Sequence, residues 1–260
     1  MTRVAVVSAR DNPLLVRLRK IVGQPDGYRR AGSFWLEGEH LCSAWLASAP
    51  GGNAQALIGE GAWRVPASAQ LAARAGSVVV VADALWPALS SLETPAPLGF
   101  LVDWPGPGAI APGLATVVLD RLQDPGNVGT ILRSAAAFGF AQVVSLKGTA
   151  ALWSPKVLRA GMGAHFGLRL VEGASREALD ALGVPLLATS PQADEEIHRA
   201  PLAWPCAWLL GHEGQGVDPA LARRCTRMLR IPQPGGQESL NVAAAAAVCL
   251  YESARRRLDN

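Results

Sequence analysis

The 260-residue chain has few cysteines and no long apolar run. Its four cysteines are scattered and form no CxxC pair, which argues against a disulfide framework or zinc site and fits buried thiols in a reducing cytosol. No apolar run reaches the roughly 18–20 residues that a membrane span needs. The first residues, MTRVAVVSARDN, lack the apolar segment of a signal peptide. We therefore expect a cytoplasmic protein with no bound metal and no membrane partner.

Several common catalytic signatures are also absent. His212-Glu213 resembles the beginning of HExxH, but Gly216 stands at the fifth position, so no zincin site is predicted. There is no GxxxxGK[ST] loop, and no GxGxxG follows the first strand. The segment GGQESL does not match GxSxG, so Ser239 is not expected to be a hydrolase nucleophile. The usual nucleotide-hydrolase and hydrolase classes are excluded.

The composition is that of a globular protein. Half of the residues are hydrophobic and 17% are charged, and the length suits one large domain or two of medium size. The formal charge of +3 permits nucleic-acid binding without arguing for it. The basic residues are nearly all arginine, which suits bidentate phosphate contacts but is equally expected from a GC-rich genome.

The chain divides into two predicted domains. In residues 1–105, Asn12-Pro13 begins a helix, and short strands alternate with helices, which predicts a small α/β domain. Prolines and glycines are dense in WPGPGAIAPG, so residues 106–114 are predicted to be a linker. The second domain, 115–260, opens with the buried strand TVVLD.

Basic residues gather near the N-terminus and on one later helix. Such a cluster is either a solvated helix face or a surface for RNA phosphates, and the sequence leaves both interpretations open. The helix that begins at Ser154-Pro155 carries two further candidates. The candidate RNA-contacting residues are Arg17, Lys20, Arg29, Arg30, Lys156 and Arg159.

Three loops of the second domain each follow a predicted strand. They are NVGTILRSAAAFG, LLGHEGQG and IPQPGGQESLN. In α/β proteins, ligands bind at such loops, outside the carboxyl ends of the strands. Glycines in these loops would let a ligand approach the backbone closely. Asn127 is placed to cap the helix of the first loop, and Arg133 lies off the apolar side of that helix.

In this order the three loops resemble the motifs of the SpoU/TrmH family of RNA 2′-O-ribose methyltransferases, within the SPOUT class. The segment WSPKVLRAGMGA is similar to the family's stretch between the first two motifs, and Glu238-Ser239-Leu240-Asn241 is the most specific match. The resemblance covers Thr116 to Glu252. The N-terminal ARDNPLLVRLRKI…YRRAGSFWLEGEHL resembles the ribosomal-protein-L30e-like substrate-binding domain of rRNA-modifying members.

The resemblance implies a fold, a cofactor and a partner. It implies a small L30e-like α/β domain, then an α/β SPOUT domain with a parallel sheet and a deep trefoil knot, which breaks the general rule against knots. S-Adenosylmethionine would bind in the knot, and the C-terminal domain would form a homodimer. The implied cofactor-binding residues are Thr189, Leu210, Gly211, Ile231 and Leu240.

The resemblance also assigns the reacting site. It places Arg133 nearest the ribose 2′-hydroxyl, and we interpret Arg133 as an electrostatic anchor because arginine does not normally deprotonate in proteins. His212 stands where the family commonly has asparagine, and we expect it still to serve a hydrogen bond within its loop. The implied catalytic residues are Arg133, Asn127, Glu213, Ser239 and Asn241.

The sequence thus predicts S-adenosylmethionine-dependent 2′-O-methylation of RNA. The L30e-like domain favours large-subunit (23S) rRNA as the substrate over tRNA. A tRNA 2′-O-methyltransferase is the second interpretation. A non-catalytic RNA-binding assembly factor is the third, and the intact set of implied catalytic residues argues against it.

Overall fold

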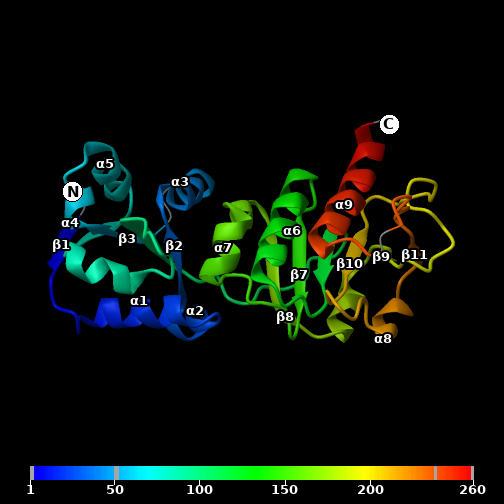
Figure 1. Ribbon diagram of the computed structural model, residues 1–260, viewed down its shortest axis with the longest axis horizontal. Helices are drawn as coiled ribbons and strands as arrows, with labels where there is room; N and C mark the ends of the chain where they lie inside the picture. The colour runs from blue at the N-terminus through cyan, green and yellow to red at the C-terminus, as the bar shows by residue number, and fades with distance from the viewer. Residues whose placement is uncertain (1–2, 50–52, 237–238, 259–260) are drawn as a thin grey trace. The chain divides into compact units, whose positions relative to one another are not determined.

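The computed structural model describes residues 3–49, 53–236 and 239–258. They form two compact units (Figure 1), of which the first comprises residues 1–106 and 153–166, and the second residues 107–152 and 167–260. The first unit therefore contains a segment from the middle of the predicted second domain. Most of the predicted linker, 106–114, is part of the second unit, to which it is hydrogen-bonded. Gly113 N–H donates to the Leu182 carbonyl at 2.8 Å.

The first unit is built on a five-stranded mixed sheet. The strands, in sheet order, are β1 (Arg3–Val7), β4 (Ser77–Val81), β3 (Ala54–Gly59), β5 (Leu98–Asp103) and β2 (Ser33–Glu37). β1, β4 and β3 are parallel, and β5 is antiparallel to both β3 and β2. Sequence analysis missed β1, an edge strand whose Val4 and Val6 are exposed and which has no buried face to give it a pattern.

Short helices complete the first unit. They are α1 (Pro13–Gly23), α2 (Gly27–Ala31), α3 (Glu39–Ser48), α4 (Glu60–Trp63), α5 (Pro66–Ala73), the 3₁₀ helix η1 (Asp83–Leu89), α7 (Pro155–Gly161) and the 3₁₀ helix η2 (Ala164–Gly167), whose last residue belongs to the second unit. The predicted start of α1 is confirmed, because the Asn12 side chain accepts a hydrogen bond from Leu14 N–H. Leu15, Leu18 and Ile21 are its buried residues.

The segment Trp153–Phe166 joins the first unit through packing and charge. The rings of Trp153 and Phe34 lie 4.6 Å apart between centroids. The Arg159 guanidinium lies 3.7 Å from the carboxylate of Glu37, which is almost fully buried on β2. The sequence does not reveal that this segment packs in the first unit, because the apolar face of α7 has the same pattern whichever sheet it covers.

The second unit contains a six-stranded sheet in which every pairing is parallel, as predicted. In sheet order the strands are β11 (Arg227–Leu229), β9 (Leu186–Thr189), β10 (Ala207–Leu210), β6 (Thr116–Leu119), β7 (Gln142–Leu146) and β8 (Arg169–Ala174). β9 begins directly after Pro185, which has no N–H for the ladder.

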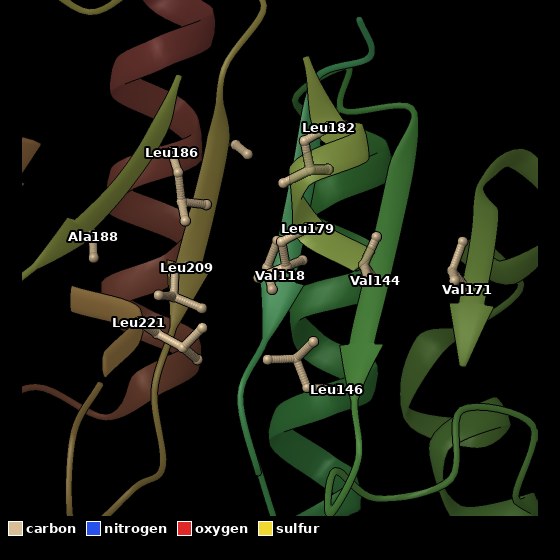
Figure 2. Packing of buried hydrophobic residues seen from close by; sticks show 11 residues of the cluster. Val118, Val144, Leu146, Val171, Leu179, Leu182, Leu186, Ala188, Leu209 and Leu221 are labelled. Carbon is tan, nitrogen blue, oxygen red and sulfur yellow. The ribbon is translucent and has the colours of Figure 1, made fainter. Parts of the chain in front are cut away.

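Both faces of this sheet are covered, which explains its apolar strands. On one face, Val118, Val144 and Leu209 pack with residues of η3 (Glu177–Leu182) and α8 (Pro219–Ala222) (Figure 2). Val117 and Leu119 alternate with Val118 and are buried on the other face. There α6 (Pro125–Ala137) and α9 (Val242–Leu258) pack against each other and against β7 and β10 (Figure 1).

The long C-terminal helix α9 is fixed to the sheet by buried polar contacts. Trp208 of β10 donates its indole N–H to the Ser253 hydroxyl at 2.9 Å, and Ser253 donates to the Cys249 carbonyl at 3.0 Å. Near its end, Arg256 donates to the carbonyls of Ile197 and His198 at 3.2 and 3.1 Å. The helix therefore holds both a central strand and the loop after β9.

The cysteines are unpaired, and three of the four predicted buried thiols are buried. Cys225, which follows α8, is only partly buried. Burial raises the pKa of the Cys206 thiol to about 11. None of the helices in the described residues is long and apolar enough to cross a membrane.

Candidate functional site

A cavity of about 300 Å³ lies at the carboxyl ends of β9, β10 and β11. Parallel strands end at one edge of a sheet, so the loops that follow them meet there. The lining comes from three loops and the first turns of α9. The lining residues are Thr189, Ser190, Pro191, Leu210, Gly211, His212, Glu213, Gly214, Gly216, Val217, Ile231, Gln233, Ser239, Leu240, Val242 and Ala245.

Most of the predicted cofactor-binding and catalytic residues lie around this cavity. All five residues predicted to bind the cofactor line it, as do two of the predicted catalytic residues, Glu213 and Ser239. The other three, Asn127, Arg133 and Asn241, are not part of its lining. Glu238 of the third motif lies outside the described residues.

The glycine loop after β10 is folded tightly on itself. A Cβ atom at Gly211 would lie 2.3 Å from the backbone carbon of Gly216 and 2.3 Å from the nitrogen of Val217, so only glycine fits. Gly216 adopts φ +67°, a conformation that favours glycine. The His212 ring closes the turn, since its Nδ1 accepts hydrogen bonds from the N–H groups of Gly214 and Gln215 at 3.0 and 3.3 Å.

Side-chain hydrogen bonds connect the three motifs. Asn241 Oδ1 accepts from Ala243 N–H at 2.9 Å and so caps α9, while its Nδ2 donates to Asn127 Oδ1 at 3.1 Å. Asn127 Nδ2 in turn donates to Glu213 Oε1 at 3.3 Å. A residue of each motif is thus held by the next.

The prediction that Asn127 caps α6 is wrong. Asp124 is the cap, and its Oδ1 accepts from Asn127 N–H at 2.9 Å. Proline at position 125 suits the first turn, so the helix begins one turn before Asn127. The Asn127 side chain is consequently free to bridge Asn241 and Glu213.

The Glu213 carboxylate anchors the glycine loop to the first motif. Oε2 accepts from Gln123 N–H at 3.2 Å, and Oε1 accepts from Asp124 N–H at 3.2 Å. Partial desolvation of the carboxyl raises its pKa, but the hydrogen bonds from its own N–H, from Gln123 and Asp124, and from Asn127 outweigh it. The pKa of Glu213 is therefore below its ordinary value, and the group is an anion at neutral pH.

Asp120 and Arg121 support the site and were not predicted. Asp120 is buried at the end of β6, where it accepts two hydrogen bonds from Arg121, each 3.0 Å long. Arg121 also donates to Gln215 Oε1 at 3.1 Å, which joins β6 to the glycine loop. Hydrogen bonding to Asp120 raises the pKa of Arg121. The available signal was an aspartate at the end of an apolar strand, TVVLD.

Arg133 lies on the exposed side of α6, as its position off the apolar stripe predicted. No hydrogen bond or ion pair holds its guanidinium to any described residue. Its charge is therefore available to a ligand at the surface of this unit.

The candidate RNA-contacting residues of the first unit fall into two groups. Arg17, Lys20 and Arg30 line a cavity of about 770 Å³ beside α1 and α2. One Arg17 nitrogen donates to the Ala31 carbonyl at 2.7 Å, which fixes the side chain across the two helices. Arg29 is exposed on α2, with its guanidinium 5.5 Å from the centre of the Tyr28 ring.

The two candidates on α7 differ from each other. Lys156 is exposed and can meet phosphates. Arg159 is partly buried, pairs with Glu37 and donates to the Ser91 hydroxyl at 3.1 Å. We therefore withdraw Arg159 as an RNA contact, since its charge is committed to a buried carboxylate. No group of metal-ligating side chains that could hold an ion occurs in the described part of the chain.

The fold and the loop-lined cavity define an α/β protein with a ligand site at the carboxyl edge of a parallel sheet. Residues 115–251 match the SpoU rRNA Methylase family, and the chain belongs to that family. It is similar to an uncharacterized tRNA/rRNA methyltransferase of Synechocystis, with 33% identity over 98% of this chain and 95% of that protein.

Two further proteins are similar along most of their length. The 23S rRNA (guanosine(2553)-2′-O)-methyltransferase RlmP of Bacillus subtilis is 32% identical over 85% of this chain and 88% of its own. The crystal structure of an AdoMet-bound rRNA methyltransferase from Sinorhizobium meliloti has a TM-score of 0.82 and 28% identity, covering 98% of each chain. The similarity therefore extends across both compact units.

Proposed function

We propose that this protein transfers a methyl group from S-adenosylmethionine to a ribose 2′-hydroxyl of large-subunit rRNA. The observation that carries the proposal is the cavity formed by the motif loops, joined by hydrogen bonds to Asn127 of the first motif. Membership of the SpoU rRNA Methylase family gives the reaction class, and the name of the Bacillus relative gives the RNA.

The residues present fit S-adenosylmethionine. The cavity is at the lower end of the range of about 300–1,000 Å³ that is usual for ligand pockets. Leu210, Ile231 and Leu240 offer apolar contacts for a flat base, and the loops bring main-chain groups to its edge. Gln233 Oε1 is buried in the wall with no hydrogen-bond donor among the described residues, so a ligand N–H or O–H would satisfy it.

The cofactor, when bound, supplies an electrophilic methyl group on a sulfonium. The protein must place the ribose hydroxyl in line with that group, and fixing two reactants can remove about 7–11 kcal/mol of barrier. Asn127, Asn241 and Glu213 hold the motif loops in register for this task. We assign Arg133 to orient the hydroxyl and the adjacent phosphate and to lower the hydroxyl's pKa by its positive charge.

We further propose that the second unit contains the trefoil knot of the SPOUT class. The strand order β11-β9-β10-β6-β7-β8 supports it, because the chain must return from edge strand β11 to place α9 against α6. An L30e-like fold is proposed for the first unit. The mixed α/β architecture and the full-length similarity to the Sinorhizobium structure support that assignment.

RNA would be bound by both units. Arg17, Lys20 and Arg30 of the first unit surround a cavity large enough for a nucleotide, and Arg29 and Lys156 add exposed charge. Contacts of this kind to phosphates provide affinity that falls with added salt. The free cysteines fit a reducing cytoplasm, where this reaction would take place.

A homodimer through the second unit is also proposed. Leu240, Val248 and Tyr251 are exposed apolar residues of α9 and the turn before it. Ala244 lies between them at helical spacing and is exposed as well. Such a stripe is what a second copy of the helix would cover.

The test is methyl transfer from labelled S-adenosylmethionine to total rRNA and total tRNA, kept separate, from cells lacking this protein. Label at one alkali-resistant position of large-subunit rRNA is the expected result. Label in tRNA alone would identify tRNA as the substrate in place of rRNA. The tRNA/rRNA name of the Synechocystis relative makes tRNA the second candidate. No label in either RNA or in precursor ribosomal particles, with the cofactor bound, would favour a non-catalytic assembly factor.

A further inference from the structure

The His212 ring is placed to control the shape of the cofactor cavity. It lines the cavity, and its Nδ1 accepts from two successive loop N–H groups, those of Gly214 and Gln215. A nitrogen that accepts hydrogen bonds carries no proton, so the structure requires the neutral ring with its proton on Nε2. The ring thus does within its loop what a side-chain amide oxygen does at a turn.

The loop has little freedom to change independently of this ring. The His212 carbonyl accepts from Gly216 N–H at 2.8 Å, and Gly211 is packed against Gly216 with no room for a Cβ atom. Glu213, between His212 and the first ring contact at Gly214, accepts hydrogen bonds from Gln123, Asp124 and Asn127. Opening the turn would therefore disturb both the cavity wall and the link to the first motif.

Protonation of Nδ1 would place a third N–H group opposite the two backbone N–H donors, so both hydrogen bonds would be lost. The charged side chains on this loop and on the segments bonded to it include the Glu213 anion and Arg121, which donates to Gln215 and is paired with Asp120. Asp218, which follows the loop, is paired with Arg176. No hydrogen bond joins any of them to the ring within the described residues. They leave the two backbone N–H groups as its partners.

We propose that His212 is a positioning residue whose neutral ring holds the cofactor loop closed, so that the protein's affinity for the methyl donor falls as pH is lowered. The proposal rests on the proposed function in taking S-adenosylmethionine as the ligand. An imidazole nitrogen loses its acceptor lone pair when it is protonated, whereas a side-chain amide oxygen gains no proton near neutral pH. The sensitivity to pH therefore belongs to histidine at this position and would be lost with asparagine.

The experiment is calorimetric titration of the full chain with S-adenosylmethionine at about pH 7.5 and about pH 5.5. The wild type should bind about tenfold more weakly at the lower pH, because two hydrogen bonds to Nδ1 are lost. His212→Asn should bind with similar affinity at both values, since its amide oxygen can accept the same two N–H groups. His212→Ala should bind weakly at both.

Two controls separate the possible causes. His198→Asn changes an exposed histidine beside Glu196, away from the cavity, and should keep the wild-type dependence on pH. Any titration of the ligand itself would affect His212→Asn equally. Nitrogen NMR of histidine-labelled protein, with His212→Asn to assign the signal, should show an unprotonated Nδ1 at pH 7.5 without any ligand.

Three results would overturn the proposal. These are the same loss of affinity in His212→Asn as in the wild type, wild-type affinity in His212→Ala at pH 7.5, and a proton on Nδ1 at that pH. If the wild type bound no S-adenosylmethionine at pH 7.5, the proposed cofactor itself would fall, and this proposal with it. That result is distinguishable because it needs no variant.

Discussion

Three residues at the centre of the site each have two tasks. Asn241 caps α9 with its oxygen and holds Asn127 with its nitrogen. Asn127 continues to Glu213, whose carboxylate also receives two backbone N–H groups. Each amide presents a donor and an acceptor, which a carboxylate in its place could not do. The chemistry of these side chains explains why asparagine stands at both positions.

Arg133 should matter for turnover and not for cofactor affinity. We expect Arg133→Ala to abolish methyl transfer, because the proposed anchor of the hydroxyl is removed, while S-adenosylmethionine binding is largely kept, because Arg133 does not line the cavity. Arg223→Ala, which removes another exposed arginine of the same unit, is the control and should keep activity. Transfer assays and calorimetry on each variant measure the two effects. A collapse of cofactor affinity in Arg133→Ala would refute the assigned role.

At the scale of elements, the glycine loop and α9 shape the site. The loop turns within six residues because its glycines allow backbone-to-backbone contact. The helix provides the first residues of the cavity wall and is held by β10 and by the loop after β9. Each element can be tested with one substitution.

Gly211→Ala should damage the cavity. The new Cβ would meet the backbone of Gly216 and Val217, which cannot move aside as a side chain could. We expect at least a tenfold loss of S-adenosylmethionine affinity and a destabilisation of roughly 1–3 kcal/mol, the usual cost of overpacking. Gly235→Ala lies in the third motif loop with nothing within 4 Å and should be close to neutral. Equal affinity for the two variants in calorimetry would contradict the account.

Glu252→Gln should weaken α9 in a pH-dependent way. Hydrogen bonds from Arg255 and then Arg256 lower the pKa of Glu252 against the opposing effect of burial. The carboxylate's contribution is therefore full above its unfolded pKa of about 4.3 and is lost as pH falls through the lower folded value. In urea denaturation the variant should lose about 0.5–1 kcal/mol at neutral pH.

That difference between Glu252→Gln and the wild type should narrow at pH values below the unfolded pKa. Asp180→Asn, which breaks the exposed pair with Arg224, is the control and should change stability little at any pH. A constant deficit for Glu252→Gln from neutral to acid pH would show that lost packing, and not charge, is responsible.

At the scale of the whole molecule, the chain forms two compact units, and it leaves the second unit at residue 153 to add one segment to the first before it re-enters the second. Residues 153–166 belong by sequence to the family match at 115–251 and by packing to the first unit. The pair of Arg159 with buried Glu37 fixes this arrangement. The proposed dimer would add a second level of assembly through α9.

Val248→Asp should separate the proposed dimer. It places a charge in the exposed apolar stripe of α9, which a second copy could cover only by burying that charge. Light scattering after size exclusion should show a monomer for the variant and a dimer for the wild type, with unchanged circular dichroism. Val65→Asp alters a more exposed valine of the first unit and should remain dimeric. A monomeric wild type would refute the proposal directly.

The local pattern of the sequence determined the buried strands, the main helices and the three motif loops, but not the exposed edge strand β1. Apolar runs such as TVVLD and AWLL identify buried strands because both faces of a parallel sheet are covered. The residues predicted around the cofactor gather at one cavity for the same reason, since loops after parallel strands meet at one edge.

Only the tertiary structure decided which polar groups meet. Asn127 is bridged to residues 86 and 114 positions away, and Arg159 is paired with Glu37, so neither partner could be read from nearby sequence. The cap of α6 at Asp124 was open to local reading, but asparagine and aspartate cap helices about equally well. Side-chain pairing depends on distances that the fold creates, whereas burial depends on patterns that the sequence already carries.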